Sequence, residues 1–163
     1  DEGADIALGD SVIKALPAHF LHSVGNFQFY DPVSKILFTG DLGASMVDEF
    51  TPVTARDFDA HVPSMLGFHR RYMAGNRACV IWADMVQNLD IDMIVPQHGR
   101  PIQGKAAVDR FIDWIRNLQC GIDLMVAPGK FREAIRPVTD ISSRPQRAPL
   151  STPVRSNPFE GVG

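Results

Sequence analysis

The sequence predicts an α/β (α+β) domain built on a mixed or antiparallel sheet with flanking helices. Three observations point to this class. Short apolar runs separated by Gly, Asp and Pro fill residues 6–39, apolar residues recur every three or four positions over much of residues 55–118, and one short apolar run lies at residues 92–95. At 163 residues, of which 45% are hydrophobic, the chain is long enough for one domain with a buried core.

Two hairpins are expected near the start of the chain. Their strands are predicted at residues 6–8, 11–16, 27–30 and 35–39. Gly9-Asp10 suits a tight turn within the first hairpin. Asp31-Pro32 suits the opening of a type I turn within the second. Between the hairpins, residues 20–22 are predicted to be the end of a short strand.

Helical spacing dominates the second half of the domain. Helices are expected at residues 55–72, 77–89 and 106–118. The last has one apolar face and is expected to lie on the sheet. Residues 92–95 are predicted to be a strand that ends at Pro96. Tyr72 and Trp82 are expected to pack in the core or between helices.

The chain divides into a domain at residues 1–135 and a tail at residues 136–163. The tail is rich in Pro, Arg and Ser, and each Pro removes a backbone donor and restricts the residue before it. An extended segment is therefore expected. Two interpretations stay open, a disordered tail and an arm that contacts its own domain or a partner.

Composition excludes some classes of function. A net charge of −3 without basic runs argues against nucleic-acid binding. No stretch approaches the roughly 18 to 20 apolar residues that span a bilayer, so we expect a soluble, cytoplasmic protein without a membrane segment. Cys79 and Cys120 belong to no C-x-x-C motif and are expected to be reduced, buried thiols.

Three potential metal ligands lie where apolar segments give way to Gly or Pro. They are His22, Asp41 and His98. Asp41 follows the second hairpin and His22 precedes it, so chain reversal is expected to bring both to one sheet edge. A carboxylate can offer one oxygen to each of two cations, which suits Asp41 as a bridge between metals.

Several neighbouring residues are candidates for supporting roles. Gly40 and Gly99 allow a close backbone approach or a positive φ beside the ligands. His19 is a candidate hydrogen-bond donor to a metal ligand, and Tyr72 is a candidate pocket residue, with ordinary packing as the alternative for both. His61 and His69 are expected on a helix surface. If the three ligands are not a metal site, they are a capped core histidine, a turn aspartate and a loop histidine.

These motifs resemble a known family. The segments His22-Ser23-Val24-Gly25-Asn26, Phe38-Thr39-Gly40-Asp41-Leu42-Gly43 and Pro96-Gln97-His98-Gly99 are similar to the latter half of the metallo-β-lactamase-fold domain. Among its branches they look most like the oxygen-binding di-iron proteins related to flavodiiron proteins. The resemblance runs from about Ile6 to Ala127. It implies half of an αββα sandwich and two iron ions, with His22 on one, His98 on the other and Asp41 bridging.

The chain also departs from the family pattern. The family's first ligand motif, H-x-E-x-D-H, does not occur in these 163 residues, and neither does a flavodoxin-like phosphate loop. We therefore expect three partners: a chain or segment that carries the missing ligands, an external electron donor, and other subunits in an oligomer. Alone, the chain is expected to bind metal poorly.

Three functions follow as hypotheses. The first is a di-iron protein that binds, and either reduces or senses, dioxygen or nitric oxide; if it turns over, it is an oxidoreductase once completed. The second is a zinc-dependent hydrolase of an ester or thioester. Against it, the segment after His22 lacks the second histidine of glyoxalase-like hydrolases. The third is a non-catalytic half-domain whose role is assembly.

Overall fold

The structure, a computed structural model, describes residues 2–48 and 54–125. The strands are β1 (Ala4–Leu8), β2 (Ser11–Pro17), β3 (Phe27–Asp31), β4 (Ile36–Gly40), β5 (Met93–Pro96) and β6 (Ile102–Gln103). The helices are α1 (Phe58–Tyr72), α2 (Asn76–Val86), α3 (Lys105–Arg116) and the 3-10 turn η1 (Gly121–Leu124). The predicted tail at residues 136–163 lies outside the described residues.

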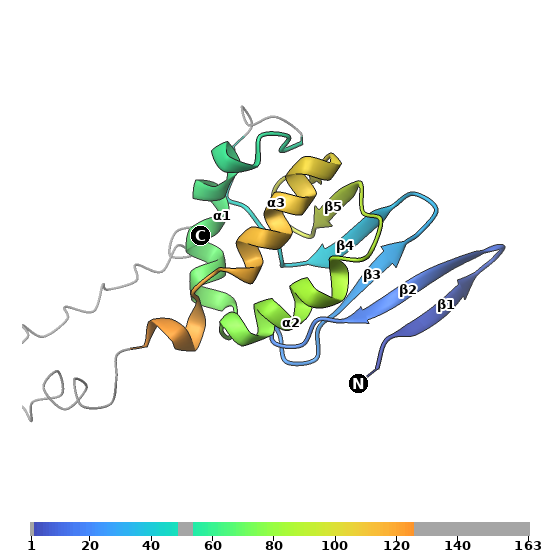
Figure 1. The fold of residues 1–163 in the computed structure, drawn as a ribbon, viewed down its shortest axis with the longest axis horizontal. Helices are drawn as coiled ribbons and strands as arrows, with labels where there is room; N and C mark the ends of the chain where they lie inside the picture. The colour runs from blue at the N-terminus through green and yellow to red at the C-terminus, as the bar shows by residue number, and fades with distance from the viewer. Residues whose placement is uncertain (1, 49–53, 126–163) are drawn as a thin grey trace, which may run out of the picture. The chain divides into compact units, whose positions relative to one another are not determined.

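All six strands form one mixed sheet in the order β1-β2-β3-β4-β5-β6. Strands β1 to β4 are antiparallel neighbours, β5 runs parallel to β4, and β6 runs antiparallel to β5 (Figure 1). Both predicted hairpins are confirmed. The first turns at Gly9, whose φ of +59° favours glycine. In the second turn, the Asp31 carboxylate accepts a hydrogen bond from the Val33 amide at 2.9 Å.

One expectation about strands is wrong, and one strand was not expected. Residues 20–22 form a turn instead of a strand end, since Phe20 has a φ of +67° and its amide donates to the Ser23 carbonyl at 2.8 Å. Strand β6 was not expected, because two residues flanked by Pro101 and Gly104 give no alternating pattern. The three helices lie where helical spacing placed them, with ends that differ by up to three residues.

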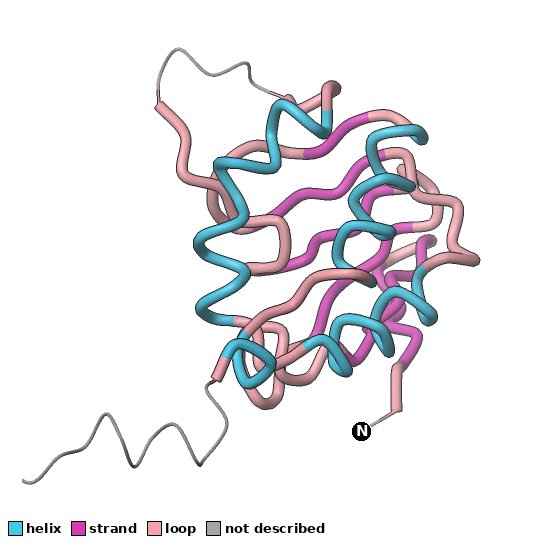
Figure 2. The backbone as a smooth tube through the Cα atoms, turned by 60° about the vertical axis from the view of Figure 1, so that its left-hand side comes forward, coloured by secondary structure: helices cyan, strands magenta, loops and turns pink. Residues whose placement is uncertain are grey.

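The helices cover one face of the sheet and form the core with it (Figure 2). On the covered face, Leu37 of β4 and Ile94 of β5 are fully buried. They belong to one cluster with Trp82 of α2 and Phe111 of α3. The Trp82 indole donates a hydrogen bond to Gln28 of β3 at 2.7 Å, so these two buried polar groups are paired. The predicted core position of Trp82 is confirmed.

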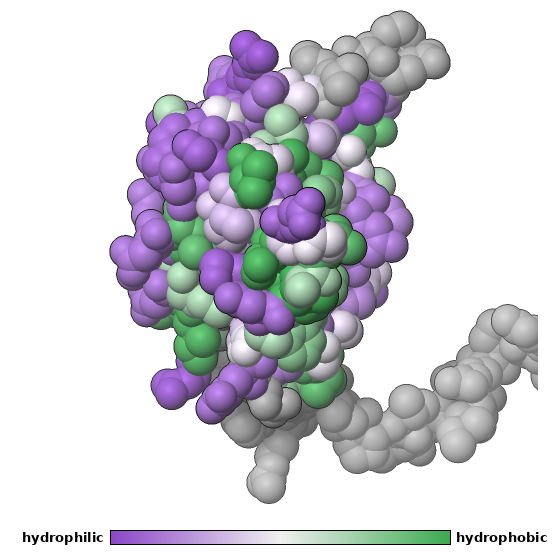
Figure 3. All heavy atoms as spheres, turned by 90° about the vertical axis from the view of Figure 1, so that its right-hand side faces the viewer, coloured by the Kyte–Doolittle hydropathy of each residue, from purple (hydrophilic) through white to green (hydrophobic). Residues whose placement is uncertain are grey.

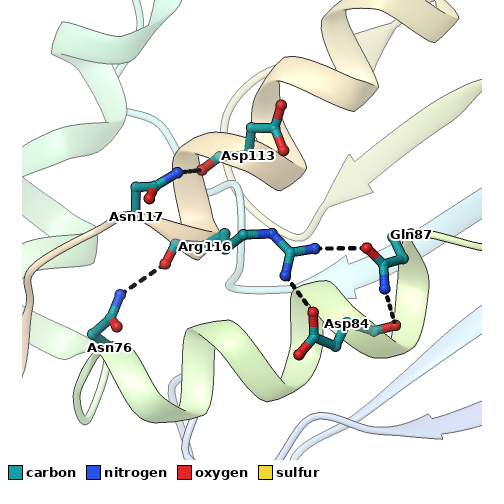
Figure 4. Close-up of polar contacts among 6 residues, drawn as sticks. All are labelled: Asn76, Asp84, Gln87, Asp113, Arg116 and Asn117. Carbon is teal, nitrogen blue, oxygen red and sulfur yellow. Dashed lines mark hydrogen bonds and ion pairs between the residues drawn. The ribbon is translucent and has the colours of Figure 1, made fainter.

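A polar network joins α2 to α3 (Figure 4). The Arg116 guanidinium pairs with the Asp84 carboxylate and donates to the Gln87 side chain at 2.9 Å. The Asn76 amide donates to the Arg116 carbonyl at 2.9 Å, which satisfies a carbonyl at the end of α3. These contacts hold the two helices together over the sheet.

The opposite face of the sheet exposes apolar side chains. Phe29 and Phe38 are cross-strand partners on this face, and each is 43% exposed. Phe27 and, on the first hairpin, Ile6 and Leu8 are exposed as well. Figure 3 shows hydrophobic residues at the surface among hydrophilic ones, on the side from which the hairpin ends project in Figure 1. An apolar sheet face of this kind is typical of a surface that packs against another layer.

Two further expectations concern helices and cysteines. None of the helices within residues 2–48 and 54–125 is long and apolar enough to cross a bilayer. Cys79 and Cys120 are buried free thiols, as predicted. Their sulfur atoms lie 3.8 Å apart, and burial raises the pKa of both thiols.

Candidate metal centre

Two of the three predicted ligands meet at one edge of the sheet. Asp41 follows β4 and His98 follows β5, and these strands are parallel neighbours, so both residues leave the sheet at the same edge. The His98 Nε2 atom lies 3.7 Å from the Asp41 Oδ1 atom. The His98 side chain is 67% exposed and that of Asp41 29%, which leaves the pair open to solvent on one side.

Ser45 joins the loops that carry this pair. Its amide donates to the His98 carbonyl at 3.3 Å, and its hydroxyl accepts from the Arg100 amide at 3.1 Å. A Cβ at Gly99 would lie 2.0 Å from the Ser45 hydroxyl oxygen, and Gly99 has a φ of +92°. Only glycine fits there, so the positive φ expected at Gly99 is confirmed.

The loop after β4 is held by its own hydrogen bonds. The Ala44 amide donates to the Asp41 carbonyl at 3.0 Å, and the Thr39 hydroxyl donates to the Leu42 carbonyl at 2.5 Å. Gly40 has a φ of +60°, as expected for a glycine beside this candidate ligand. These contacts give the Asp41 backbone a defined conformation at the sheet edge.

His22 lies in a different environment. It belongs to the turn between β2 and β3, and its side chain is exposed. Its ring stacks against two aromatic rings of α1, with centroids 5.9 Å from Phe68 and 5.4 Å from Tyr72. Within its turn, the Asn26 side-chain amide donates to the Leu21 carbonyl. Tyr72 is 48% exposed, so it is a surface partner of His22 and not a core residue as one prediction had it.

The described residues do not complete a metal site. In residues 2–48 and 54–125, no group of three or more His, Cys, Asp or Glu side chains is close enough together to hold a metal ion. The structure therefore brings Asp41 and His98 together and leaves His22 outside their pair. The assignment of His22 as a ligand stays a prediction.

The other histidines differ from expectation. His61 and His69 were expected on a helix surface, but they are 7% and 0% exposed. His69 accepts a hydrogen bond from the Gly43 amide at 2.8 Å, so it contacts the loop that carries Asp41. Helical spacing of apolar residues alone gave no signal for this contact, because it counts histidine as polar.

His19 is half-buried, and its ring meets Phe27 edge to face at a centroid distance of 5.3 Å. Both of its ring nitrogens are buried, and neither has a hydrogen-bond partner in the described parts of the chain. This contact fits the packing alternative, and the role of His19 as a hydrogen-bond donor to a metal ligand stays a prediction.

A small apolar hollow of about 200 Å³ adjoins His98. Its lining residues are Ala44, Ser45, Met46, Phe68 and His98. A larger hollow of about 920 Å³ lies between α1 and α3 and includes neither Asp41 nor His98. The hollow beside the pair is small enough to favour small ligands over bulky ones.

The chain is similar to solved structures of di-iron proteins. The chemotaxis sensor ODP described as a peroxy diiron species is 42% identical, with a TM-score of 0.71, over 76% of this chain and 53% of that chain. The apo state of chemotaxis sensor ODP from T. denticola is 41% identical, with a TM-score of 0.71, over 76% of this chain and 51% of that chain. The present chain thus spans about half the length of these sensors.

A more distant likeness shows the fold alone. The flavodiiron protein from Giardia intestinalis is 19% identical, with a TM-score of 0.61, over 71% of this chain and 28% of that chain. No curated protein matches the chain. The six-stranded mixed sheet with its helices is half of a metallo-β-lactamase-like domain, as the resemblance implied.

A family model described as ODP family beta lactamase matches residues 1–99, a range that includes Asp41 and His98. The match covers more than half of the chain, and it agrees with the likeness to the ODP sensors. The chain belongs to the ODP family of beta-lactamase-like proteins.

Proposed function

We propose that this chain supplies His22, Asp41 and His98 to a non-haem di-iron centre that binds dioxygen or nitric oxide. The observation that carries the proposal is the Asp41–His98 pair, 3.7 Å apart at the carboxyl ends of two parallel strands. It occurs in a chain 42% identical to a chemotaxis sensor described as a peroxy diiron species.

The donor atoms of this pair fit a metal ion. Metal bonds to imidazole nitrogen and carboxylate oxygen are each about 2.1 Å long, so two ligands of one ion lie at most roughly 4.2 Å apart. The Nε2 and Oδ1 atoms fall within that limit. A shared Asp41 leaves its second oxygen for another ion, which is the bridging role proposed for it. Bound iron would supply the redox chemistry that these side chains lack.

The centre needs further ligands and a second layer of structure. The exposed apolar face of the sheet, with Phe29 and Phe38 at its middle, supports a partner that covers it. We propose that this partner is the segment or chain bearing the H-x-E-x-D-H ligands, and that electrons come from an external donor. Sensing and reduction differ in whether the bound gas is released unchanged, and the small hollow beside His98 is compatible with both.

Metal analysis of the chain combined with that complementary segment tests the proposal. We expect two iron ions per complex and a change in absorption when the reduced complex meets oxygen. Zinc without iron, and no absorption change, would favour the hydrolase hypothesis instead. The absence of any metal in the completed complex would favour the assembly hypothesis.

The exposed sheet face gives a separate prediction. The chain alone should associate with other polypeptides or with itself. Burying this apolar face stabilises the associated state by about 25 cal/mol for each Å² of apolar area removed from water. Size-exclusion chromatography with light scattering measures this. A monodisperse monomer at all concentrations would contradict the prediction.

A further inference from the structure

His69 connects helix α1 to the loop that carries Asp41. Its side chain is fully buried, and both ring nitrogens have partners. The Nδ1 atom lies 2.8 Å from the Met65 carbonyl oxygen, one turn earlier in α1. The Nε2 atom lies 2.8 Å from the Gly43 amide nitrogen, 26 residues away in the chain.

These two partners define the tautomer of the His69 imidazole. A carbonyl oxygen only accepts, so Nδ1 carries the hydrogen and donates it to Met65. The Gly43 amide only donates, so Nε2 offers it a lone pair. Burial lowers the pKa of His69 to about 4, which is consistent with a neutral ring at pH 7.

The ring has little freedom to move away from Gly43. It meets Trp114 of α3 edge to face at a centroid distance of 5.1 Å and Phe68 of α1 at 5.5 Å. Gly43 in turn lies two residues after Asp41 and has a φ of +98°. Asp41 therefore lies in a turn that is held on both sides. Thr39, two residues before Asp41, donates to the Leu42 carbonyl, and Gly43, two residues after it, donates to His69.

We propose that His69 is a positioning residue for the metal ligand Asp41. Its Nε2 lone pair holds the Gly43 amide and so orients the Asp41 carboxylate toward His98. The inference rests on the proposed function of Asp41. It adds a residue on a helix, outside all three ligand motifs, that controls metal affinity without touching the metal. Partners of this kind commonly change metal affinity by about 10- to 100-fold when they are lost.

Two amide substitutions separate this role from general packing. His69→Gln places an amide oxygen near the Nε2 position, so an acceptor for Gly43 remains. His69→Asn places its amide near the Nδ1 position, so the contact to Met65 remains but Gly43 is out of reach. Both variants lose the aromatic ring, and a role limited to ring packing would affect them similarly.

The test uses the 163-residue chain combined with the complementary segment that bears the H-x-E-x-D-H ligands. Mn²⁺ is the only metal added, because this cation suits carboxylate ligands. Paramagnetic broadening of amide NMR signals near Asp41 and His98 reports the Mn²⁺ dissociation constant directly, without a redox reaction. We expect the dissociation constant to rise about tenfold in H69N and to change less than about twofold in H69Q.

Each outcome bears on a different statement. Equal dissociation constants in H69N and the unchanged chain, with broadening at Asp41 in both, would overturn the positioning role and leave the proposed function intact. No broadening at Asp41 in the complex of the unchanged chain with the complementary segment would contradict the proposed function, and the inference with it. If H69N does not fold, H69Q decides, because a tenfold loss there would overturn the role of the acceptor.

Discussion

Two regions hold candidate ligands by different physical means: the sheet edge after β4 and β5, which carries Asp41 and His98, and the turn between β2 and β3, which carries His22. At the edge, parallel pairing of β4 with β5 sets both backbones, and Ser45 hydrogen-bonds to the His98 loop at 3.3 Å. His22 lies in a turn outside the strands, and stacking on Phe68 and Tyr72 holds its ring. The comparison shows that the sheet places one pair of candidate ligands, while the position of the third candidate depends on side-chain packing.

The largest expected change in stability comes from adding one methyl group at this sheet edge. Gly99→Ala should lower the free energy of unfolding by about 3 kcal/mol, because the new Cβ meets Ser45 and φ is +92°. Urea denaturation followed by circular dichroism measures it. Gly25→Ala in the His22 turn is the matched control. No described atom lies within 4 Å of its Cβ, so we expect a change within about 0.5 kcal/mol. Equal effects at the two sites would contradict the comparison.

The second largest effect is a pH dependence of stability that arises from His69, which contacts the loop carrying Asp41. Its pKa is lowered from 6.5 to about 4 by burial, so the unfolded chain binds a proton at higher pH than the folded chain does. Stability should therefore fall as pH decreases from 6.5 toward 4, with about 2 kcal/mol lost by pH 5. Denaturation of the unchanged chain and of H69Q at pH 7.5 and pH 5 measures the difference. A parallel pH dependence in the two proteins would show that His69 is not the cause.

The smallest effect should come from the aromatic stack on His22. Tyr72→Ala removes one of two stacked rings, each worth roughly 0.5 to 1.5 kcal/mol, so His22 should become more mobile with little loss of stability. NMR chemical shifts of the His22 ring report the stacking, and Tyr72→Phe should preserve them. Unchanged His22 shifts in the alanine variant would mean that Tyr72 does not hold this ring.

The same contrast explains what the sequence could predict. Asp41 and His98 follow apolar strands that end in glycine- or proline-containing segments, and such strand ends are visible in a single sequence. The turn around His22 was mistaken for a strand end because the positive φ of Phe20 leaves no mark on residue type. His69 was missed because periodicity cannot distinguish a buried, hydrogen-bonded histidine from a surface one.

The central claim is that Asp41 bridges two metal ions in the completed domain. Iron content after anaerobic loading of the chain with its complementary segment tests it most directly, in the unchanged protein and in Asp41→Asn. The amide offers a weaker, uncharged ligand, so the account predicts two iron ions per complex in the unchanged protein and less than half of that content in the variant. Full iron occupancy in Asp41→Asn would contradict the bridging role.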